Sequence, residues 1–418
     1  MSNIRILSLT LVISAVLSPS VFATNGLAPT GLGMAHRSMG GAAVANPINT
    51  TSMATNPAAA SFIPDGYDVG LEVFVPNRSA TLAGAEYNGN GKTTFFIPEG
   101  GYKRSINSRV ATGVVVYGNG GMNTDYKTPV PGFANPFIPP TGEPLGVDYQ
   151  QLFVAPTVSF KVGERNAIGL SANLVYQKFK VEGATGFSGF SASPNDVSNK
   201  GYDSSTGAGL SIGWQGQLSP SVTMGASYRS KVKMGKLDSY KGLLANGGEF
   251  NVPAATTVGL GFKATPKTTV ALDVQRIEYG KLGSIGNSST LLAQGKAMGS
   301  DGGPGFGWSN QTVYKVGVKH QVTPTVAVMA GYNYGKSPIK ASETTVNVLA
   351  PATSEKHLTL GTEVKLSPKS DLTISYIHSF KKEIKGQSNP IFGGMFDLGR
   401  YDLKMDQNAI GVAYSHRF

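Results

Sequence analysis

The 418-residue sequence contains no cysteine. In an exported chain this absence excludes a scaffold held by disulfides, thiolate metal sites and thiol catalysis. A long apolar run is also absent, because nothing beyond the first 23 residues approaches the roughly 18 residues that a membrane-spanning helix needs. Charged residues make up only 15% of the chain, and the basic ones are scattered without an arginine-rich run. These absences exclude a helical membrane protein.

The first 23 residues have the pattern of a secretory signal peptide. Arg5 provides a positive start, residues 6–17 are apolar, and Val21-Phe22-Ala23 fits a cleavage site with small residues. We therefore expect a mature chain that starts near Thr24, outside the cytoplasm. Its net charge of +11 favours anionic partners. We expect these to be lipid head groups or lipopolysaccharide phosphates, and not nucleic acid, which an exported protein seldom meets.

One type of turn recurs through the second half of the chain. A serine or threonine precedes a proline within 218–221, 264–267, 322–325 and 366–369. Proline fixes φ and keeps the preceding residue out of the helical region, so each site predicts a tight turn. On both sides of the turns apolar and polar residues alternate, as Leu358 and Leu360 do with Thr359. This alternation predicts antiparallel hairpins with one apolar face.

Such strands suit either a soluble sandwich or an outer-membrane barrel, whose apolar face meets lipid. Connection lengths favour the barrel, because short turns alternate with long polar loops at 182–205, 231–251, 279–309, 337–354 and 382–406. We count fourteen strands, at 67–75, 95–104, 109–117, 150–162, 166–181, 206–218, 221–231, 253–264, 268–278, 311–321, 325–335, 355–366, 371–381 and 408–418. An even number places both termini on the periplasmic side. The prediction is an all-β transmembrane antiparallel barrel in the outer membrane of a Gram-negative bacterium.

Aromatic residues fit this prediction. Tyrosines near the predicted strand ends would form an interfacial girdle: Tyr176, Tyr228, Tyr279, Tyr332, Tyr334 and Tyr376. The last strand alternates up to Phe418, and this ending resembles the signal read by the outer-membrane assembly machinery. We therefore expect that machinery to be a partner of the chain.

The segment ahead of the strands has a different character. Residues 25–61 are rich in small residues, carry apolar side chains and show no sustained period. A surface linker would be more polar, and a core element would be more regular. We therefore divide the chain into a signal peptide (1–23), a plug or hatch (24–62) and a barrel (63–418).

At this point the sequence resembles a known family. Gly31-Leu32-Gly33-Met34-Ala35, Met39-Gly40-Gly41-Ala42 and Asn56-Pro57-Ala58 ahead of a long barrel resemble the FadL-type outer-membrane transporters, as does Tyr228-Arg229-Ser230-Lys231-Val232-Lys233. The resemblance implies a fourteen-stranded barrel with an N-terminal hatch, which carries long-chain fatty acids or, in some members, aromatic hydrocarbons. It also implies lateral release through an opening where the third strand kinks. The loop at 182–205 departs from the family, because it is short where the archetype builds an outer ligand groove.

The resemblance assigns hatch or gating roles to Gly33, Asn56, Pro57 and Ala58, with Asn56-Pro57-Ala58 in contact with the kinked third strand. Tyr117 and Gly118 match the position of the kink and the lateral opening. Glycine breaks a pairing ladder at no steric cost, although a simple strand-to-loop exit explains the same residues.

A transporter of apolar molecules needs an apolar path and no reactive centre. Candidate ligand contacts are apolar side chains in polar loops: Phe187, Phe190, Leu243, Leu244 and Phe250. Packing of loop on loop explains them equally well. A lumen arginine, Arg229 or Arg109, could bind a carboxylate head group, or it could belong to an ion pair within the lumen.

Enzyme motifs are not evident. The five histidines are widely separated without metal spacing, and Ser337-Pro338-Ile339-Lys340 has no companion Lys-Thr-Gly box. We expect no catalytic residues, no metal and no cofactor. The predicted function is passive uptake of hydrophobic small molecules by a monomer, with fatty acids first and aromatic or alkane hydrocarbons as the alternative. A surface adhesin or phage receptor is the alternative from another class.

Overall fold

The computed structural model describes residues 25–133 and 144–418. The predicted signal peptide and its cleavage site lie outside the described residues. No helix in the described part is long and apolar enough to cross a membrane.

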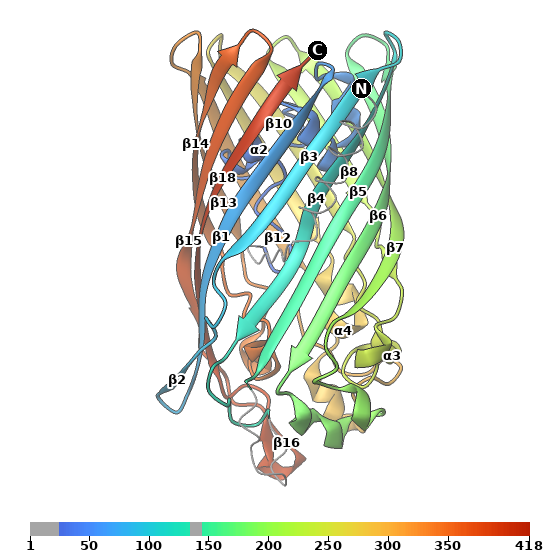
Figure 1. Cartoon of the computed structure of the whole chain (residues 1–418), viewed down its shortest axis with the longest axis vertical. Helices are drawn as coiled ribbons and strands as arrows, with labels where there is room; N and C mark the ends of the chain where they lie inside the picture. Colours follow the sequence, from blue (N-terminus) through green and yellow to red (C-terminus); the bar gives the residue numbers. More distant parts are fainter. Residues whose placement is uncertain (1–24, 134–143) are drawn as a thin grey trace, which may run out of the picture.

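The wall of the molecule is one antiparallel sheet closed on itself (Figure 1). Consecutive wall strands are neighbours, and the first and last strands close the sheet from Gly66–Arg417 to Thr81–Asp402. In the described part of the chain the barrel has fourteen strands: β1 (Gly66–Leu82), β3 (Phe95–Ser105), β4 (Val110–Asp125), β5 (Gly146–Val162), β6 (Asn166–Glu182), β7 (Asp203–Ser219), β8 (Val222–Arg229), β10 (Ala255–Thr265), β11 (Thr268–Ile277), β12 (Gln311–Gln321), β13 (Val326–Gly335), β14 (Lys356–Ser367), β15 (Ser370–Ile384) and β18 (Asp402–Arg417). The predicted barrel is confirmed.

The predicted serine- or threonine-proline turns join β7 to β8, β10 to β11, β12 to β13 and β14 to β15. They lie at the end of the barrel where β1 begins and β18 ends, which we call the turn end. Several strands are longer than predicted. β1 continues to Leu82 and β4 to Asp125, and β18 already begins at Asp402. These extensions lie toward the other end of the barrel, where outward side chains such as Asn77 are polar, so the apolar alternation stops before the strand does.

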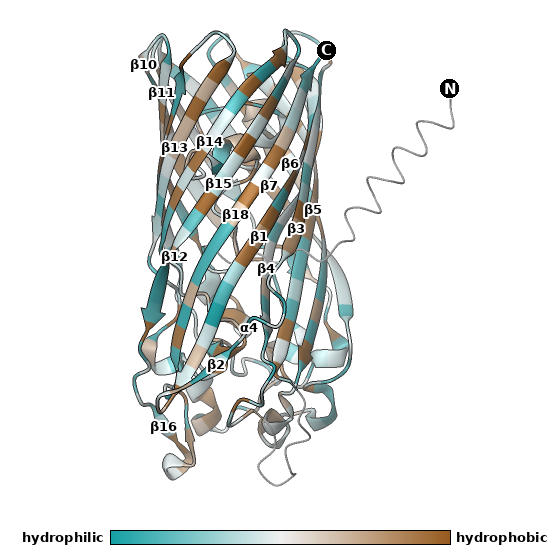
Figure 2. Ribbon diagram, turned by 60° about the vertical axis from the view of Figure 1, so that its left-hand side comes forward, coloured by the Kyte–Doolittle hydropathy of each residue, from teal (hydrophilic) through white to brown (hydrophobic). Residues whose placement is uncertain are grey.

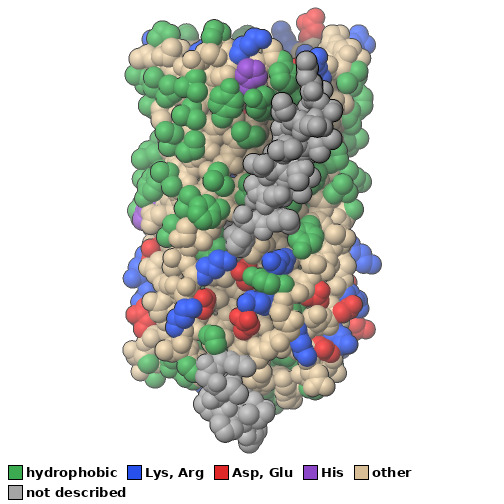
Figure 3. Space-filling view, viewed as in Figure 1, with side chains coloured by type: hydrophobic (Ala, Val, Ile, Leu, Met, Phe, Trp, Pro, Cys, Tyr) green, Lys and Arg blue, Asp and Glu red, His purple; other side chains and the backbone are tan. Residues whose placement is uncertain are grey.

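Side chains alternate between the two faces of the wall. Leu71, Leu170 and Leu260 are exposed on the outer face, whereas Asp68 and Glu72 point inward and are buried. Apolar positions recur along the strands in Figure 2. Figure 3 shows apolar side chains over the upper part of one face and a band of charged side chains below them. This distribution is that of a barrel whose apolar belt faces lipid.

Residues 25–65, which we call the luminal segment, lie inside the barrel (dark blue in Figure 1). The segment contains three short helices, α2 (Met34–Arg37), η1 (Thr50–Ala54) and η2 (Pro57–Ser61). Gly33 precedes α2 with φ +86°, and a Cβ at this position would lie 2.1 Å from Thr51 Oγ1. Backbone with positive φ and such close approach favours glycine. This requirement explains the small residues that interrupt any regular period.

The long loops lie at the opposite end, which we call the loop end (bottom of Figure 1). Short elements here are β2 (Ala85–Asn88), β9 (Lys233–Met234), β16 (Pro390–Ile391), β17 (Phe396–Asp397), α3 (Ala245–Gly248), α4 (Gly283–Gly286), η3 (Thr185–Phe190), η4 (Pro194–Asp196), η5 (Asp238–Tyr240), η6 (Tyr279–Lys281), η7 (Ser289–Gln294), η8 (Ala341–Glu343), η9 (Val346–Val348) and η10 (Phe392–Gly394). Their apolar side chains form a common core with the neighbouring strand ends. The loops therefore pack on one another and on the mouth of the barrel.

Candidate functional site

A buried ionic contact holds the luminal segment to β1 and β3. Arg37 Nη1 lies 2.5 Å from a carboxylate oxygen of Glu72, and Nη2 lies 3.4 Å from one of Glu99. Glu99 also accepts hydrogen bonds from the backbone N–H groups of Gly33, at 3.2 Å, and Met34, at 2.9 Å. All three ionic side chains are almost fully buried. Arg37 thus compensates two carboxylates of the wall. One of these carboxylates, Glu99, also positions the start of α2.

Asn56 and Pro57 tie the segment to another part of the wall. Asn56 Nδ2 donates to the backbone oxygens of Val44, at 2.7 Å, and Trp214, at 3.0 Å. Its Oδ1 accepts from Ala58 N at 3.1 Å, so Asn56 caps η2, and Pro57 occupies the first helical position, where no N–H is needed. A Cβ on Gly213 of β7 would lie 2.0 Å from Asn56 Oδ1, so this close approach depends on glycine.

A further hydrogen bond between the motif and the wall joins Ser159 Oγ of β5 to the backbone oxygen of Ala58, at 3.3 Å. Within the described residues, the predicted motif is therefore hydrogen-bonded to β7 and β5, and not to Tyr117 or Gly118 of the third strand. The structure also brings η2 close to β4, since Ala60 lies in one apolar cluster with Val115 and Tyr117 of that strand. The expected contact of Asn56-Pro57-Ala58 itself with the kink stays a prediction. The role of the motif as a hatch remains a prediction.

The third wall strand, β4, is irregular where the sequence predicted a kink. Gly118 pairs with Leu152 and Gly120 with Gln151, so Asn119 is an extra residue in the ladder with β5. An extra residue of this kind is a β-bulge, which bends the strand that carries it. Pairing between β3 and β4 ends at Glu99–Tyr117, although β3 begins at Phe95 and β4 runs to Asp125.

On the far side of the bulge, β4 contacts the connection that precedes β3. Asn90 forms an isolated bridge with Asp125, and Gly91 N donates to Asp125 O at 2.8 Å. Between these contacts and Glu99–Tyr117, the described structure has no backbone pairing of residues 95–98 with residues 118–124. We call this stretch the wall interruption.

Three predicted residues meet beside the interruption. Arg229 Nη1 of β8 donates to Asn119 Oδ1 at 2.6 Å, and its guanidinium carbon lies 5.4 Å from the ring centre of Phe153. The Phe153 ring stacks on Tyr117 with centres 5.2 Å apart. Tyr117, Gly118 and Arg229 are thus in one cluster. Sequence reasoning missed Asn119, because a bulge is a property of two paired strands.

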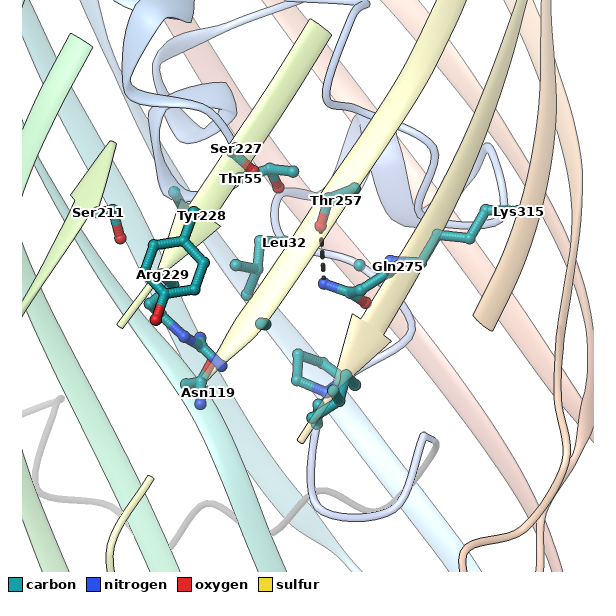
Figure 4. Close-up of a pocket in the computed structure, with 16 residues that line it drawn as sticks. Leu32, Thr55, Asn119, Ser211, Ser227, Tyr228, Arg229, Thr257, Gln275 and Lys315 are labelled. Atoms are coloured by element: carbon teal, nitrogen blue, oxygen red, sulfur yellow. Dashed lines mark hydrogen bonds between the residues drawn. The ribbon is translucent and has the colours of Figure 1, made fainter. Parts of the chain in front are cut away.

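A small cavity of about 50 Å³ lies between the luminal segment and the wall (Figure 4). Leu32 and Thr55 line it from the segment, and Asn119, Arg229 and Lys315 line it from the wall. Gln275 Nε2 donates to Thr257 Oγ1 at 3.3 Å on its border. The cavity is smaller than the roughly 150 Å³ that holds benzene in a protein interior. A hydrophobic solute must therefore displace side chains or part of the segment to enter.

Two positions predicted from the sequence are wrong. Arg109 is exposed in the turn between β3 and β4, so it does not face the lumen. Tyr279 does not belong to an interfacial girdle, because it is buried at the luminal segment. Its hydroxyl accepts from Leu27 N and Ala28 N, both at 3.0 Å, and donates to Asn25 O at 2.7 Å. The five other tyrosines of the predicted girdle are exposed.

The apolar loop residues lie in the loop core, apart from the cavity. Phe187 packs edge-on against Phe133, with ring centres 5.5 Å apart, and Phe190 stacks on Phe392 at 5.5 Å. Phe250 is buried against Tyr149, and Leu243 and Leu244 are buried in the same core. This arrangement is the loop-on-loop packing that the sequence left open. Contact with a ligand remains a prediction for all five.

A closed barrel with an apolar outer face, a polar inner face and its own N-terminal segment inside defines a class of outer-membrane channel. The family model described as outer membrane protein transport protein (OMPP1/FadL/TodX) matches residues 10–418, so the chain belongs to this family. The protein is accordingly an outer-membrane channel for hydrophobic compounds, and it is not an enzyme. The predicted family and location are confirmed.

Solved structures share the fold at low identity. The toluene transporter TodX of Pseudomonas putida has a TM-score of 0.72 at 18% identity, over 93% of this chain and 99% of that chain. A Pseudomonas aeruginosa FadL homologue has 0.67 at 15%, over 96% and 100%. The toluene transporter TbuX of Ralstonia pickettii has 0.65 at 16%, over 93% and 99%. Comparison with curated proteins finds no match.

Proposed function

We propose that the protein takes up long-chain fatty acids by diffusion, with the luminal segment as a hatch and the wall interruption as a lateral exit. The observation that carries this proposal is the position of Asn119. It is the bulge residue of β4, it lines the luminal cavity, and it accepts the hydrogen bond from Arg229. The cavity and the interruption therefore share one side chain.

A lateral route through the wall is supported by the luminal segment, which blocks the route along the barrel axis. The luminal segment is buried across the lumen and tied to β1, β3, β5 and β7 by the contacts of Arg37, Asn56 and Ala58. An apolar solute that continued along the axis would also have to enter periplasmic water. Leaving through the interruption would keep it in an apolar environment, at a saving of about 25 cal/mol per Å² of apolar surface.

The charges at the cavity favour a carboxylate head group. Arg229 and Lys315 both line it, and both are basic. A charge-assisted hydrogen bond to a carboxylate is stronger than one to a neutral acceptor such as the Asn119 amide. An arriving carboxylate would compete with Asn119 for Arg229 and so loosen the contact across the cavity. The chain of the fatty acid would then lie toward the wall interruption.

Aromatic hydrocarbons are the second candidate. The structures of TodX and TbuX, which share this fold, are those of toluene transporters. A monoaromatic hydrocarbon is compact and offers no carboxylate to Arg229 or Lys315. Its transport would depend on the hatch and the wall interruption and not on these two charges.

The two substrates are separated by removing the charges. In a strain lacking the gene, the double variant Arg229→Gln/Lys315→Gln is expected to lower the initial rate of labelled oleate uptake by about tenfold, the equivalent of one lost charge-assisted contact. Toluene uptake is expected to change little. Arg109→Gln, exposed in the turn between β3 and β4, is the matched control.

Equal losses for oleate and toluene would contradict a head-group role and make the two charges structural. Unchanged oleate uptake by the double variant would likewise contradict a head-group role. A wild type that carries toluene but no oleate would establish the aromatic substrate instead. A wild-type protein that carries neither compound would contradict the proposed uptake of both.

A further inference from the structure

The outer face of the barrel has an apolar groove on the side of β8 and β10–β13. It encloses about 730 Å³ and is lined by outward side chains that include Leu260, Leu272, Val274, Tyr314 and Tyr334. These side chains are exposed by 36–54% of their surface. The five strands span about 20 Å across their direction, at 4.7–4.9 Å per strand. That width accommodates several acyl chains side by side.

A second, basic pocket of about 600 Å³ lies at the loop end of the same wall. Arg276, Lys336, Lys340 and Lys382 line it, against Glu355 and Glu383. Lys382 is paired with Glu355 at 3.2 Å. The other three cations make no salt bridge with a described residue, and all three are exposed. The pocket therefore has an excess of positive charge that neighbouring carboxylates do not neutralise.

The groove and the pocket are continuous, because Tyr314 and Tyr334 line both. Strand geometry explains the change from apolar to basic. The outward positions on β11 are Leu272, Val274 and then Arg276. Next to β12, the outward Tyr334 of β13 is followed two residues later by Lys336. Arg276 Nη1 donates to Thr312 Oγ1 at 2.7 Å, across the β11–β12 pair, which holds the guanidinium on the outer face. The charges thus begin where the lipid-facing row ends.

We propose that this surface binds the phosphorylated glycolipid of the outer leaflet, with its acyl chains in the groove and a phosphate of its lipid A part in the basic pocket. The loop end is the extracellular side of such barrels, so the pocket lies at the level of the outer-leaflet head groups. Four cations against Glu355 and Glu383 leave a net charge of +2 in the pocket, which suits a phosphate of charge near −2. The width of the groove suits a lipid with more than two chains. The site lies on the outer wall, so it is independent of the transport route through the lumen.

The test uses the full-length mature protein, purified in detergent and stripped of lipid. Binding of hexa-acylated, bisphosphorylated lipid A is measured by native mass spectrometry, alongside dephosphorylated lipid A, phosphatidylglycerol and inorganic phosphate. The variant Arg276→Gln/Lys336→Gln/Lys340→Gln removes the three exposed cations. The variant Lys231→Gln/Lys233→Gln/Lys236→Gln makes the same charge change at the loop end, after β8, and is the matched control. Gel mobility before and after heating reports whether each barrel is folded.

The expected result is a one-to-one lipid A adduct that binds at least tenfold more weakly to the first variant and normally to the control. Removal of the phosphates from lipid A is expected to weaken its binding to the wild type by a similar factor. Equal loss in both variants would overturn the site, since the effect would be one of net charge. Equal binding of phosphatidylglycerol would overturn the preference for a multi-chain glycolipid, and full competition by inorganic phosphate would overturn the role of the groove. Unchanged oleate uptake by the folded first variant is expected, which separates this proposal from the transport proposal.

Discussion

Arg37 is the residue on which the position of the luminal segment depends most directly. It compensates Glu72 and Glu99 in a fully buried site. Removing one partner of a buried ionic contact costs about 3–5 kcal/mol, because the remaining charge is left buried and unpaired. Two carboxylates would be stranded here. We expect this loss to weaken the contact between the luminal segment and the wall and to leave the barrel intact, since the β1–β3 ladder does not include the Arg37 side chain.

We therefore predict that Arg37→Met releases the luminal segment while the barrel stays closed. Single-channel recording in planar bilayers should show a higher conductance than the wild type, and limited proteolysis should cleave within residues 25–65. The triple variant Arg37→Met/Glu72→Gln/Glu99→Gln is the control, because replacing all the charges removes the stranded carboxylates. A conductance equal to that of the wild type in Arg37→Met would show that the other contacts hold the segment alone.

At the scale of residues, the sequence predicts which residues matter better than it predicts where their side chains lie. The family resemblance points to Asn56 and Pro57, and the structure shows their local role, which is to cap and begin η2. Arg109 and Arg229 looked equivalent as lumen arginines, but one lies in a turn and the other on the inner face of β8. Its place near a strand end predicts Tyr279 in the girdle, but its hydrogen-bond partners, Leu27 and Ala28, are about 250 positions away in the sequence. Contacts that join distant segments cannot be read from local alternation.

At the scale of elements, the wall strands were the best predicted part. Lipid on one side of the wall and the lumen on the other require apolar and polar residues to alternate along each strand. This alternation is visible in the sequence wherever a strand crosses the apolar belt. The bulge in β4 has no such signal, because Tyr117 to Gly121 is equally compatible with an exit into a loop. The structure shows instead that β4 continues to Asp125 with its ladder to β5 intact beyond Asn119.

Deleting Asn119 should remove the bulge and let β4 follow a regular register. Leu152 and Gln151 would then face consecutive residues of β4, and residues beyond Tyr117 could extend the ladder with β3. We predict that the deletion leaves a folded barrel, seen as heat-modifiable gel mobility, but strongly lowers the initial rate of oleate uptake.

Asn119→Ala separates the bulge from its side chain. It keeps the extra residue but removes the acceptor of Arg229, so it should retain uptake better than the deletion does. Normal transport by the folded deletion variant would exclude lateral exit at this point. Failure of the deletion variant to assemble would instead show that the bulge serves the structure of the wall.

At the scale of the whole molecule, the barrel is closed by its own ladder between β1 and β18, and the luminal segment is an additional element inside it. The wall and the segment are connected through Asp65 at the turn end and through side-chain contacts elsewhere. This construction allows the segment to move without opening the sheet. It also makes the hatch role testable by a covalent bond, since the chain has no cysteine of its own.

Ser61 and Ser159 provide the place for that bond, because their Oγ atoms lie 2.7 Å apart between the luminal segment and β5. In Ser61→Cys/Ser159→Cys a disulfide, with sulfur atoms about 2.05 Å apart, would hold η2 against the wall. If transport requires η2 to move, oxidised protein should take up oleate slowly and recover when dithiothreitol is added. Thr157→Cys/Ser171→Cys is the matched control, since its Oγ atoms are also 2.7 Å apart but both belong to the wall. Full transport by the oxidised tether would mean that this part of the segment is a fixed plug, and that the route to the wall interruption passes along residues 28–32 instead.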